Sequence, residues 1–178
     1  MNRNNKNNYI LIGMPTSGKS TVGVILAKIL GMDFLDTDLL IQQREGMLLP
    51  DIIERKGVDT FLKCEENALI SIKKENTVIA TGGSAVYSMA AMDFLRQSGV
   101  IIYLKVEKND LLRRLKNVRE RGVVLQDGET IDEMFETRSE LYESYADVVV
   151  YENDNTIEET VQMTVDALNH SQSKLTDI

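Results

Sequence analysis

A glycine-rich loop lies between an apolar run and a helical segment near the start of the chain. Residues 13–21 read GMPTSGKST, directly after the apolar residues 9–12 and at the start of a segment with helical spacing, residues 20–30. The pattern Gly-x-x-x-x-Gly-Lys-Ser is typical of a loop whose backbone N–H groups surround phosphate oxygens at the positive end of a helix. The sequence therefore predicts a strand, an anion-binding loop and a helix in that order.

The polar side chains of this loop have distinct expected roles. Lys19 is expected to reach the terminal phosphates of a nucleotide, the Ser20 hydroxyl to bind Mg²⁺, and Thr21 to help hold the nucleotide. The alternative is a glycine-rich turn that matches the pattern by chance, and the predicted strand and helix on either side argue against it. The expected nucleotide-binding residues are Gly13, Thr16, Ser17, Gly18, Lys19, Ser20, Thr21 and, from a later basic segment, Arg114.

Short apolar runs of strand length alternate with segments of helical spacing along the whole chain. The predicted strands are residues 9–12, 34–36, 78–80, 100–104 and 148–151. The predicted helices are residues 20–30, 39–45, 50–56, 59–74, 89–97, 108–116, 131–145 and 157–168. Continuously apolar strands are typical of a parallel sheet that crossover helices bury on both faces. With 178 residues, we expect one three-layer α/β/α domain.

One long segment and the two ends lack such a pattern. Residues 117–129 contain Gly122 and Gly128, and the sequence Thr130-Ile-Asp-Glu133 that follows predicts a capping box at the next helix. A loop of this length in a compact domain is usually functional or mobile, so we interpret residues 117–129 as a lid. The ends, residues 1–8 and about 170–178, are expected to be flexible tails.

Charge and composition exclude several classes of partner. A formal net charge of −8 would repel a nucleic-acid backbone. No stretch reaches the eighteen or so apolar residues that cross a bilayer, and the start of the chain lacks the apolar core of a signal peptide. The single cysteine, Cys64, allows no internal disulfide and is expected to pack as a small apolar side chain on a helix. We therefore expect a cytoplasmic monomer that binds neither nucleic acid nor membrane.

Two acidic residues stand at the end of the second predicted strand, in the sequence Asp36-Thr37-Asp38. The ligand crevice of an open parallel sheet lies at the carboxyl ends of its strands, so both carboxylates are expected beside the phosphate loop. Asp36 would hold Mg²⁺ through water, and Asp38 would accept a hydrogen bond from a substrate hydroxyl and take its proton. The alternative is that both acids only cap the next helix. The only histidine, His170, lies in the expected C-terminal tail and is not a candidate base.

Two further segments are candidates for the site. Gly82-Gly83 follows the third predicted strand, where it would let backbone approach a ligand closely or merely form a turn. Residues 105–121 hold seven bases against three acids, a local charge of +4 that is suited to a nucleotide. The alternative for this run is a solvated helix face. Because Arg119 and Arg121 fall in the expected lid, at least one is expected to approach the phosphates when the lid closes.

Taken in order and spacing, these motifs resemble the shikimate kinase family. The resemblance rests on GMPTSGKST, Asp36-Thr37-Asp38, Gly82-Gly83, the basic segment, and Arg138 ahead of Leu141-Tyr142, and it covers about residues 9–168. It implies a P-loop NTPase fold of the nucleoside monophosphate kinase type, with a five-stranded parallel sheet, and phosphoryl transfer from ATP, with Mg²⁺, to a hydroxy acid. It also implies that Asp38, Gly82, Gly83 and Arg138 contact the acceptor and that Arg119 or Arg121 is the lid arginine.

The chain departs from the family pattern at three places. Leu62 stands where an arginine usually helps to bind the substrate carboxylate, Ser84 replaces a third glycine, and the lid lacks the proline usual after its arginine. We therefore keep two alternatives to a kinase that phosphorylates the 3-hydroxyl of shikimate. One is a kinase for another sugar acid or polyol, such as gluconate. The other is a nucleotide-binding regulatory protein without transfer activity.

Overall fold

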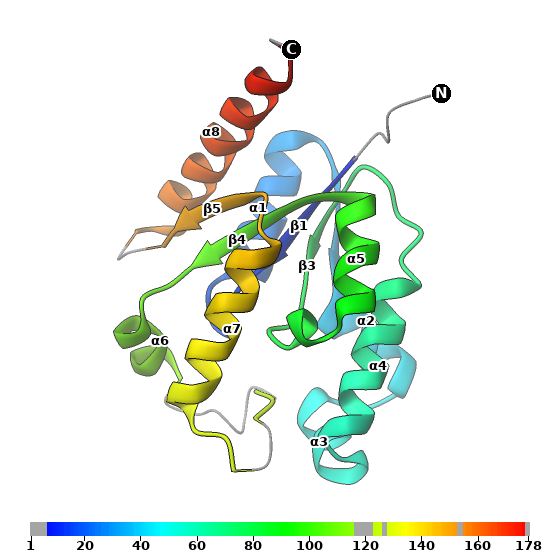
Figure 1. Cartoon of the computed structure of the whole chain (residues 1–178). Coiled ribbons are helices and arrows are strands. Elements are labelled where there is room, and N and C mark those ends of the chain that lie inside the picture. Colours follow the sequence, from blue (N-terminus) through cyan, green and yellow to red (C-terminus); the bar gives the residue numbers. More distant parts are fainter. Residues whose placement is uncertain (1–6, 116–122, 126–127, 153–154, 177–178) are drawn as a thin grey trace.

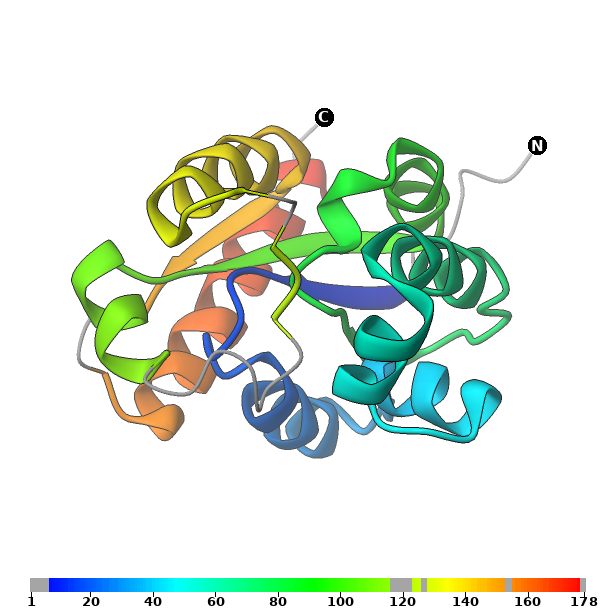
Figure 2. The same cartoon turned by 90° about the horizontal axis from the view of Figure 1, so that it is seen from below.

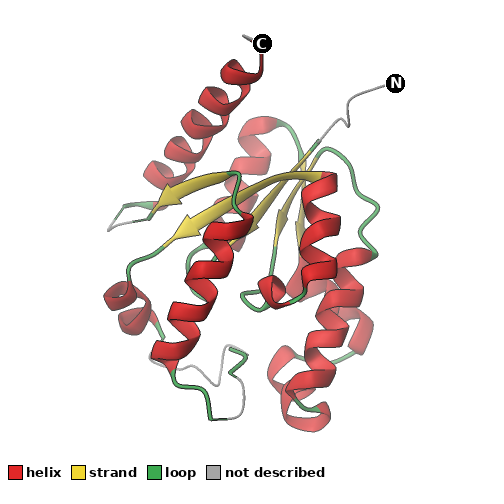
Figure 3. Cartoon of the chain, viewed as in Figure 1, coloured by secondary structure: helices red, strands yellow, loops and turns green. Residues whose placement is uncertain are grey.

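The computed structural model describes residues 7–115, 123–125, 128–152 and 155–176, and its centre is a five-stranded parallel sheet (Figure 3). The strand order is β2-β3-β1-β4-β5, so the first strand lies in the middle of the sheet. All four pairings of neighbouring strands are parallel, which confirms the predicted sheet. The strands are β1 (Asn8–Ile12), β2 (Asp33–Asp36), β3 (Thr77–Ala80), β4 (Gly99–Lys105) and β5 (Val148–Tyr151).

Helices cover both faces of this sheet, as Figures 1 and 2 show. Side chains alternate along β1, so that Ile10 and Ile12 belong to one apolar cluster and Leu11 to another. The first cluster packs against α4, α5 and α7, and the second against α1 and α8. The helices are α1 (Lys19–Leu30), α2 (Thr37–Glu45), α3 (Leu49–Lys56), α4 (Val58–Ile70), η1 (Ala85–Tyr87), α5 (Met89–Ser98), α6 (Lys108–Arg114), α7 (Ile131–Tyr145) and α8 (Ile157–Thr176).

A third apolar cluster joins helices α2, α3 and α4 beside the sheet. Ile41, Ile52 and Phe61 are its large buried side chains, and Val124 from the segment before α7 packs among them. This subdomain forms the lower right part of Figure 1, opposite the lower end of α7. It positions α2 and α4 beside the carboxyl ends of β1, β2 and β3.

Burial of the strands differs from the prediction at the edge of the sheet. The central strands β1, β3 and β4 are almost completely buried, as expected for strands covered on both faces. In β5, however, Val149 is 38% and Tyr151 is 49% exposed. The expectation that every strand is buried on both faces is therefore wrong for β5, because Val148 and Val150 pack in an apolar cluster on one face, whereas Val149 and Tyr151 on the other face belong to none of the described clusters. It is also wrong for β2, the other edge strand, which is exposed at Asp33 and only half-buried after it.

Several element boundaries also differ from those predicted. Asn8, expected in a flexible tail, begins β1 and is buried, and its side chain bonds to the Lys74 carbonyl and the Thr77 N–H across the sheet end. Helix α4 ends at Ile70, earlier than predicted, whereas α8 continues to Thr176. The later part of the chain up to residue 176 is therefore helical where a flexible tail was expected. Residues 1–6 and 177–178 lie outside the described part.

Candidate functional site

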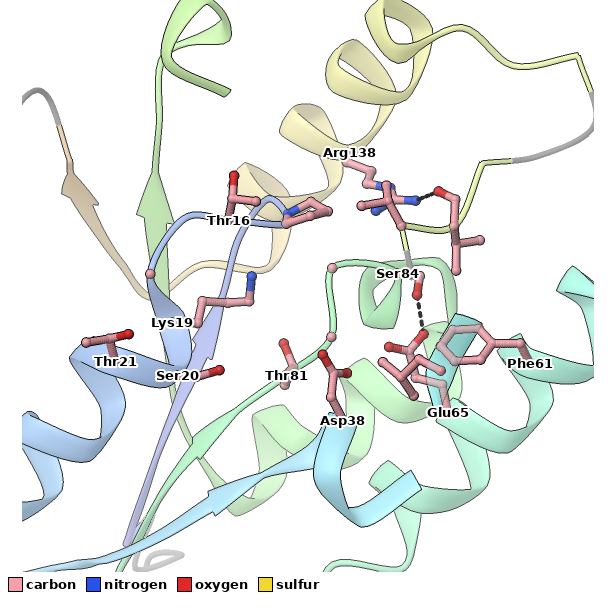
Figure 4. A pocket seen from close by; sticks show the side chains of 17 residues that line it. Thr16, Lys19, Ser20, Thr21, Asp38, Phe61, Glu65, Thr81, Ser84 and Arg138 are labelled. Atoms are coloured by element: carbon pink, nitrogen blue, oxygen red, sulfur yellow. Dashed lines mark hydrogen bonds between the residues drawn. The ribbon is translucent and has the colours of Figure 1, made fainter. Parts of the chain in front are cut away.

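A cavity of about 510 Å³ opens at the carboxyl ends of the strands (Figure 4). The phosphate loop lines one side of it, and residues from α2, α4, the loop after β3 and α7 line the rest. Among the labelled side chains of Figure 4, Lys19 lies on the phosphate-loop side, Glu65 lies opposite, and Asp38 lies between them. The lining residues are Pro15, Thr16, Gly18, Lys19, Ser20, Thr21, Asp38, Leu49, Phe61, Glu65, Thr81, Gly82, Gly83, Ser84, Val123, Val124 and Arg138.

The phosphate loop has the strand-loop-helix setting that the sequence predicts. Gly13 has a φ of 147°, and a Cβ atom there would lie 2.6 Å from the Leu104 carbonyl oxygen, so that no side chain fits. Gly18, with a φ of 81°, precedes the first residue of α1. The loop therefore passes close over the end of β4 and presents the amino end of α1 to the cavity, which is the geometry an anion requires.

Lys19 is held back against the loop that carries it. Its Nζ atom donates hydrogen bonds to the carbonyl oxygens of Gly13, at 2.8 Å, and Met14, at 2.7 Å, and to Ser17 Oγ at 3.4 Å. Burial lowers the pKa of Lys19 to about 8, although the nearby carboxylates of Asp38 and Asp36 oppose this shift. A buried ammonium with only carbonyl and hydroxyl partners is suited to exchanging them for phosphate oxygens.

Thr16 has an unusual backbone conformation within the loop. Its φ is 68°, a region that β-branched residues rarely adopt. Its Oγ1 atom is buried and has no hydrogen-bond partner among the described residues. The sequence predicts Thr16 as a nucleotide-binding residue, and the structure places it at the cavity in a strained state.

Asp36 connects the phosphate-binding segment to the start of α2. Its Oδ2 atom accepts a hydrogen bond of 2.6 Å from Ser20 Oγ, and its Oδ1 atom accepts from the N–H groups of Asp38, at 2.9 Å, and Leu39, at 3.3 Å. Asp36 is thus the N-cap of α2, which is the role that the alternative interpretation gave to both acids. Asp36 therefore caps α2 and also lies beside the phosphate-binding segment, because it accepts the hydrogen bond from Ser20.

Asp38 is not the cap of α2 and lines the cavity instead. Burial, and secondarily the neighbouring Asp36 carboxylate, raise its pKa to about 6, while Lys19 opposes this shift. The carboxyl is therefore mainly ionised at neutral pH, and it is a stronger base than an ordinary aspartate because its pKa is closer to 7. The predicted proximity of Asp38 and Lys19 is confirmed, since both line one cavity and interact electrostatically.

The glycine pair after β3 is packed so closely that neither position has room for a side chain. A Cβ atom on Gly82 would lie 2.2 Å from Glu65 Oε1 and 2.9 Å from Asp38 Oδ1. A Cβ atom on Gly83 would lie 2.9 Å from Pro15 Cδ. The segment also forms a turn, with the Gly82 N–H donating to Thr37 Oγ1 at 3.2 Å. The turn is therefore confirmed, and close packing against Glu65, Asp38 and Pro15 explains why glycine stands at both positions. A close approach of this backbone to a ligand stays a prediction.

Glu65 is a buried carboxyl in this cavity that the sequence analysis did not assign to the site. It is 2% exposed, and its Oε2 atom accepts a hydrogen bond of 2.6 Å from Ser84 Oγ. Burial raises its pKa to about 7; the nearby Asp38 also raises it, whereas the Ser84 hydrogen bond, Arg138 and Lys19 lower it. The sequence did contain a sign of this burial. Glu65 lies four residues from both Phe61 and Leu69, which places it on the apolar, buried face of α4.

Arg138 of α7 is 1% exposed and lines the cavity, as predicted. Its Nε atom donates to the Tyr87 hydroxyl at 3.1 Å, its Nη2 atom donates to the Val124 carbonyl oxygen, and the guanidinium lies 5.0 Å from the Tyr87 ring centroid. The capping box predicted at Thr130 is present at the start of α7. These contacts fix the guanidinium on the α7 side of the cavity.

The basic segment has two different environments. Lys108 of α6 pairs with Asp132 at 2.9 Å, so the solvated helix face is confirmed for it, whereas Lys105 ends strand β4 and pairs with Glu143 at 2.6 Å. Arg114 instead bonds to both oxygens of Glu152, at 3.0 and 2.8 Å, and to the Thr16 carbonyl oxygen at 3.4 Å. Arg114 therefore adjoins the phosphate loop without lining the cavity. Arg119 and Arg121 lie outside the described residues.

Two of the residues that depart from the family pattern, Ser84 and Leu62, lie in the part of the chain that the structure describes. Ser84 lines the main cavity and holds Glu65. Leu62 does not line the main cavity and instead lines a neighbouring one of about 330 Å³, which shares Glu65 and Ser84 as a common wall. The Leu62 side chain therefore faces away from the main cavity.

Comparison with known families is decisive for the class of protein. The family model described as shikimate kinase matches residues 15–169. The chain belongs to the shikimate kinase family. It is 40% identical over 136 residues to a shikimate kinase of Sulfurihydrogenibium sp. (strain YO3AOP1), covering 76% of this chain and 82% of that protein. It is 36% identical over 163 residues to one of Caldanaerobacter subterraneus subsp. tengcongensis, covering 90% and 95%.

Solved structures of the shikimate kinase family have the same fold. Shikimate kinase from Acinetobacter baumannii, in complex with shikimate, superposes with a TM-score of 0.85 at 27% identity and covers 94% of this chain and 96% of that one. Shikimate kinase from Aquifex aeolicus gives a TM-score of 0.82 at 34% identity and covers 93% and 98%. The predicted P-loop kinase fold is confirmed, and the chain is a phosphotransferase whose family uses ATP and acts on a hydroxyl group.

Proposed function

We propose that the chain transfers the γ-phosphoryl group of ATP to the 3-hydroxyl of shikimate. It would do so as a single-domain, monomeric enzyme of the cytoplasm, in the shikimate pathway that leads to aromatic amino acids. The observation that carries the proposal is that Lys19 and Asp38 line the same cavity, with Lys19 on the phosphate-loop side and Asp38 next to it. A triphosphate on the glycine loop and an alcohol at Asp38 would thus meet in that cavity, and positioning is the main requirement of phosphoryl transfer.

The phosphate-loop side would hold the nucleotide. The Lys19 ammonium would leave the Gly13 and Met14 carbonyl oxygens and bind the transferring phosphoryl group. The amino end of α1 would bind the remaining phosphate oxygens through backbone N–H groups. Arg114 would support the loop through the Thr16 carbonyl oxygen, and Arg119 or Arg121 would approach the phosphoryl group from the lid.

The donor set beside the loop fits Mg²⁺. Ser20 Oγ and Asp36 Oδ2 lie 2.6 Å apart, and one hydroxyl with one carboxylate is a set to which Mg²⁺ binds while keeping several waters. The part of the chain that the structure describes holds no group of three or more His, Cys, Asp or Glu side chains that could cage a metal. When bound, Mg²⁺ would neutralise charge on the phosphate oxygens.

The acceptor side would hold shikimate. Asp38 would accept a hydrogen bond from the 3-hydroxyl and take its proton as the oxygen attacks the γ-phosphorus atom and the bond to ADP breaks. A carboxyl with a pKa of about 6 is ionised at neutral pH and basic enough for this transfer. Arg138 would pair with the acceptor carboxylate, and Gly82 and Gly83 would leave room for the ring.

A coupled assay of ADP formation with a panel of hydroxy acids tests this proposal. We expect turnover that depends on shikimate and on Mg²⁺. Turnover of gluconate or another polyol acid, beside none of shikimate, would contradict the proposed acceptor. Binding of ATP without phosphorylation of any acceptor would favour the regulatory alternative. The solved gluconokinase from Sinorhizobium meliloti, at 19% identity and a TM-score of 0.53, shares only the fold and does not favour gluconate.

A further inference from the structure

Tyr142 of α7 has a buried hydroxyl that bonds to the backbone beside the cavity. The residue is 0% exposed, and its hydroxyl donates a hydrogen bond of 2.6 Å to the Gly83 carbonyl oxygen. Among the described residues, no other donor bonds to this oxygen. Burial raises the pKa of Tyr142 above its usual range, so the hydroxyl stays protonated and able to donate near neutral pH. Removal of the hydroxyl would therefore leave a backbone carbonyl without its hydrogen bond.

Gly83 lies between the phosphate loop and α7. A Cβ atom on it would be 2.9 Å from Pro15 Cδ, on the loop, and 3.2 Å from Arg138 Nη1, on the helix. Because the packing is this close, the position of Gly83 sets the distance between the phosphate loop and the glycine turn, which comprises residues 82–84. In the proposed complex this is the distance between the bound nucleotide and the bound acceptor.

The tyrosine itself is held in place relative to the phosphate loop. Its ring packs against that of Tyr103, with the ring centroids 5.0 Å apart, and Tyr103 is also 0% exposed. Tyr103 belongs to β4 and is paired in the sheet with Ile12, the residue directly before Gly13 of the phosphate loop. The Tyr142 hydroxyl therefore has a fixed position from which it holds the glycine turn.

We infer that Tyr142 is a positioning residue for phosphoryl transfer. Its hydroxyl holds the Gly83 carbonyl, and with it the glycine turn, at the distance from the phosphate loop that aligns the acceptor with the γ-phosphoryl group. Tyr142 does not line the main cavity, so it acts through Gly83 and touches neither ligand. The inference rests on the proposed function and extends it, since it assigns a residue that controls the spacing of the two bound molecules.

Tyr142→Phe tests this contact, because it removes the hydroxyl and keeps the ring. A misplacement of about 1 Å can slow a reaction about a hundredfold, so we expect kcat to fall by about tenfold to a hundredfold. KM for ATP and KM for shikimate should change much less, because the residues proposed to bind each ligand remain in place. The rate constant of a single turnover should fall as well. That constant does not depend on the folded fraction of the protein, so a purely structural role of Tyr142 would leave it unchanged.

Two further variants complete the test. Tyr103→Phe is the matched control, because it removes the hydroxyl of the other ring in the pair, which forms no hydrogen bond to the glycine turn. It should leave the single-turnover rate constant unchanged. Pro15→Ala loosens the glycine turn from the phosphate-loop side, where Pro15 adjoins Gly83, and should lower this rate constant by a smaller factor than Tyr142→Phe. Because both substitutions act on the position of Gly83, their effects should not add in the double variant.

The outcomes separate this inference from the proposed function. Turnover of shikimate by the wild type, with an unchanged single-turnover rate constant in Tyr142→Phe, would overturn the inference and leave the function intact. An equal loss in Tyr103→Phe, or a higher KM for shikimate with kcat unchanged in Tyr142→Phe, would also overturn it. If Tyr142→Phe does not fold, Pro15→Ala carries the test, and full transfer activity in that variant overturns the inference. Absence of shikimate turnover by the wild type would overturn the proposed function and, with it, the inference.

Discussion

The two sides of the cavity are built in different ways. The phosphate side comes from one continuous segment, residues 13–21, with Asp36 bonded to it. The opposite side, where we propose that the acceptor binds and which we call the acceptor side, collects Asp38, Glu65, Ser84 and Arg138 from four separate segments of the chain. A local motif can therefore specify the nucleotide site, whereas the acceptor site depends on how the helices pack around it.

The two sides of the cavity also carry different buried charges. On the phosphate side, the Lys19 ammonium is buried among carbonyl oxygens, and its pKa is lowered to about 8. On the acceptor side, two buried carboxyls have raised pKa values, about 6 for Asp38 and about 7 for Glu65. In the proposed complex each side binds a different ligand, so substitutions on one side should affect one ligand and not the other.

Asp38→Asn should have the largest effect of these substitutions. It should slow phosphoryl transfer without changing ATP binding. We expect kcat to decrease by about a hundredfold or more, because the amide cannot take the hydroxyl proton. ATP affinity, measured by calorimetry, should be unchanged, since Asp38 lies on the acceptor side. Replacement of Asp51, an acid of α3 that does not line the main cavity, is the control and should leave kcat unchanged. Full turnover by Asp38→Asn would show that the two sides do not meet at this residue.

Gly82→Ala should damage the acceptor side while sparing the phosphate side. The new methyl group would overlap Glu65 Oε1, 2.2 Å away, and would displace the carboxyl or the β3 loop. We expect a loss of about 1–3 kcal/mol in the free energy of unfolding and an increase of about tenfold in KM for the acceptor. KM for ATP is the internal comparison and should not change.

Gly46→Ala separates instability from the effect on the site. Gly46 has open space around it but a φ of 66°, so that alanine costs stability without contacting the cavity. A similar loss of stability with an unchanged KM would assign the Gly82→Ala effect to the site. An equal change of KM in both variants would contradict that assignment.

Much of the fold could be predicted from sequence because its signals are local. The strand, loop and helix at residues 8–30, the capping box at Thr130 and the five parallel strands follow from periodicity and turn chemistry. The exposed side chains of β5 and the helical residues after Leu168 could not be read in this way. The first depends on which strand lies at the edge of the sheet, which no local pattern encodes, and the residues after Leu168 lack the apolar spacing from which the helix was predicted.

The candidate site shows the same division. The sequence predicted Lys19 and Asp38 at one cavity, because strand ends meet at one edge of a parallel sheet. It did not assign Glu65, since one acid on the apolar face of a helix becomes informative only when the opposing Gly82 and Ser84 are known. It also left open whether Asp36 caps α2, and the structure shows that it does.

The free energy of unfolding of the unliganded protein should depend on pH because of the buried Glu65 carboxyl. Its pKa is raised from 4.5 to about 7, so the folded state binds more protons than the unfolded state in this range. The stability from this group is present below pH 4.5 and is lost as the pH rises to 7. Glu65→Gln should therefore gain stability relative to the wild type over this interval, by about 1.4 kcal/mol for each pKa unit. Denaturant unfolding at several pH values measures it, and a constant difference between the two proteins would contradict the shift.

Thr16→Gly should have the smallest effect and should stabilise the phosphate side. Glycine adopts a φ of 68° without strain and removes the unpartnered hydroxyl, so we expect a gain of about 1 kcal/mol in the free energy of unfolding. Thr16→Ser keeps the backbone conformation and the hydroxyl and should differ little from the wild type. A lower melting temperature for Thr16→Gly would show that the threonine is not strained.

A crystal structure with a non-hydrolysable ATP analogue and shikimate would test the central claim most directly. We expect the terminal phosphate at Lys19 and a shikimate hydroxyl at Asp38, with the attacking oxygen about 3–3.5 Å from the γ-phosphorus atom. Shikimate bound away from Asp38, or a triphosphate that does not contact Lys19, would contradict the claim that this cavity brings the two reacting groups together.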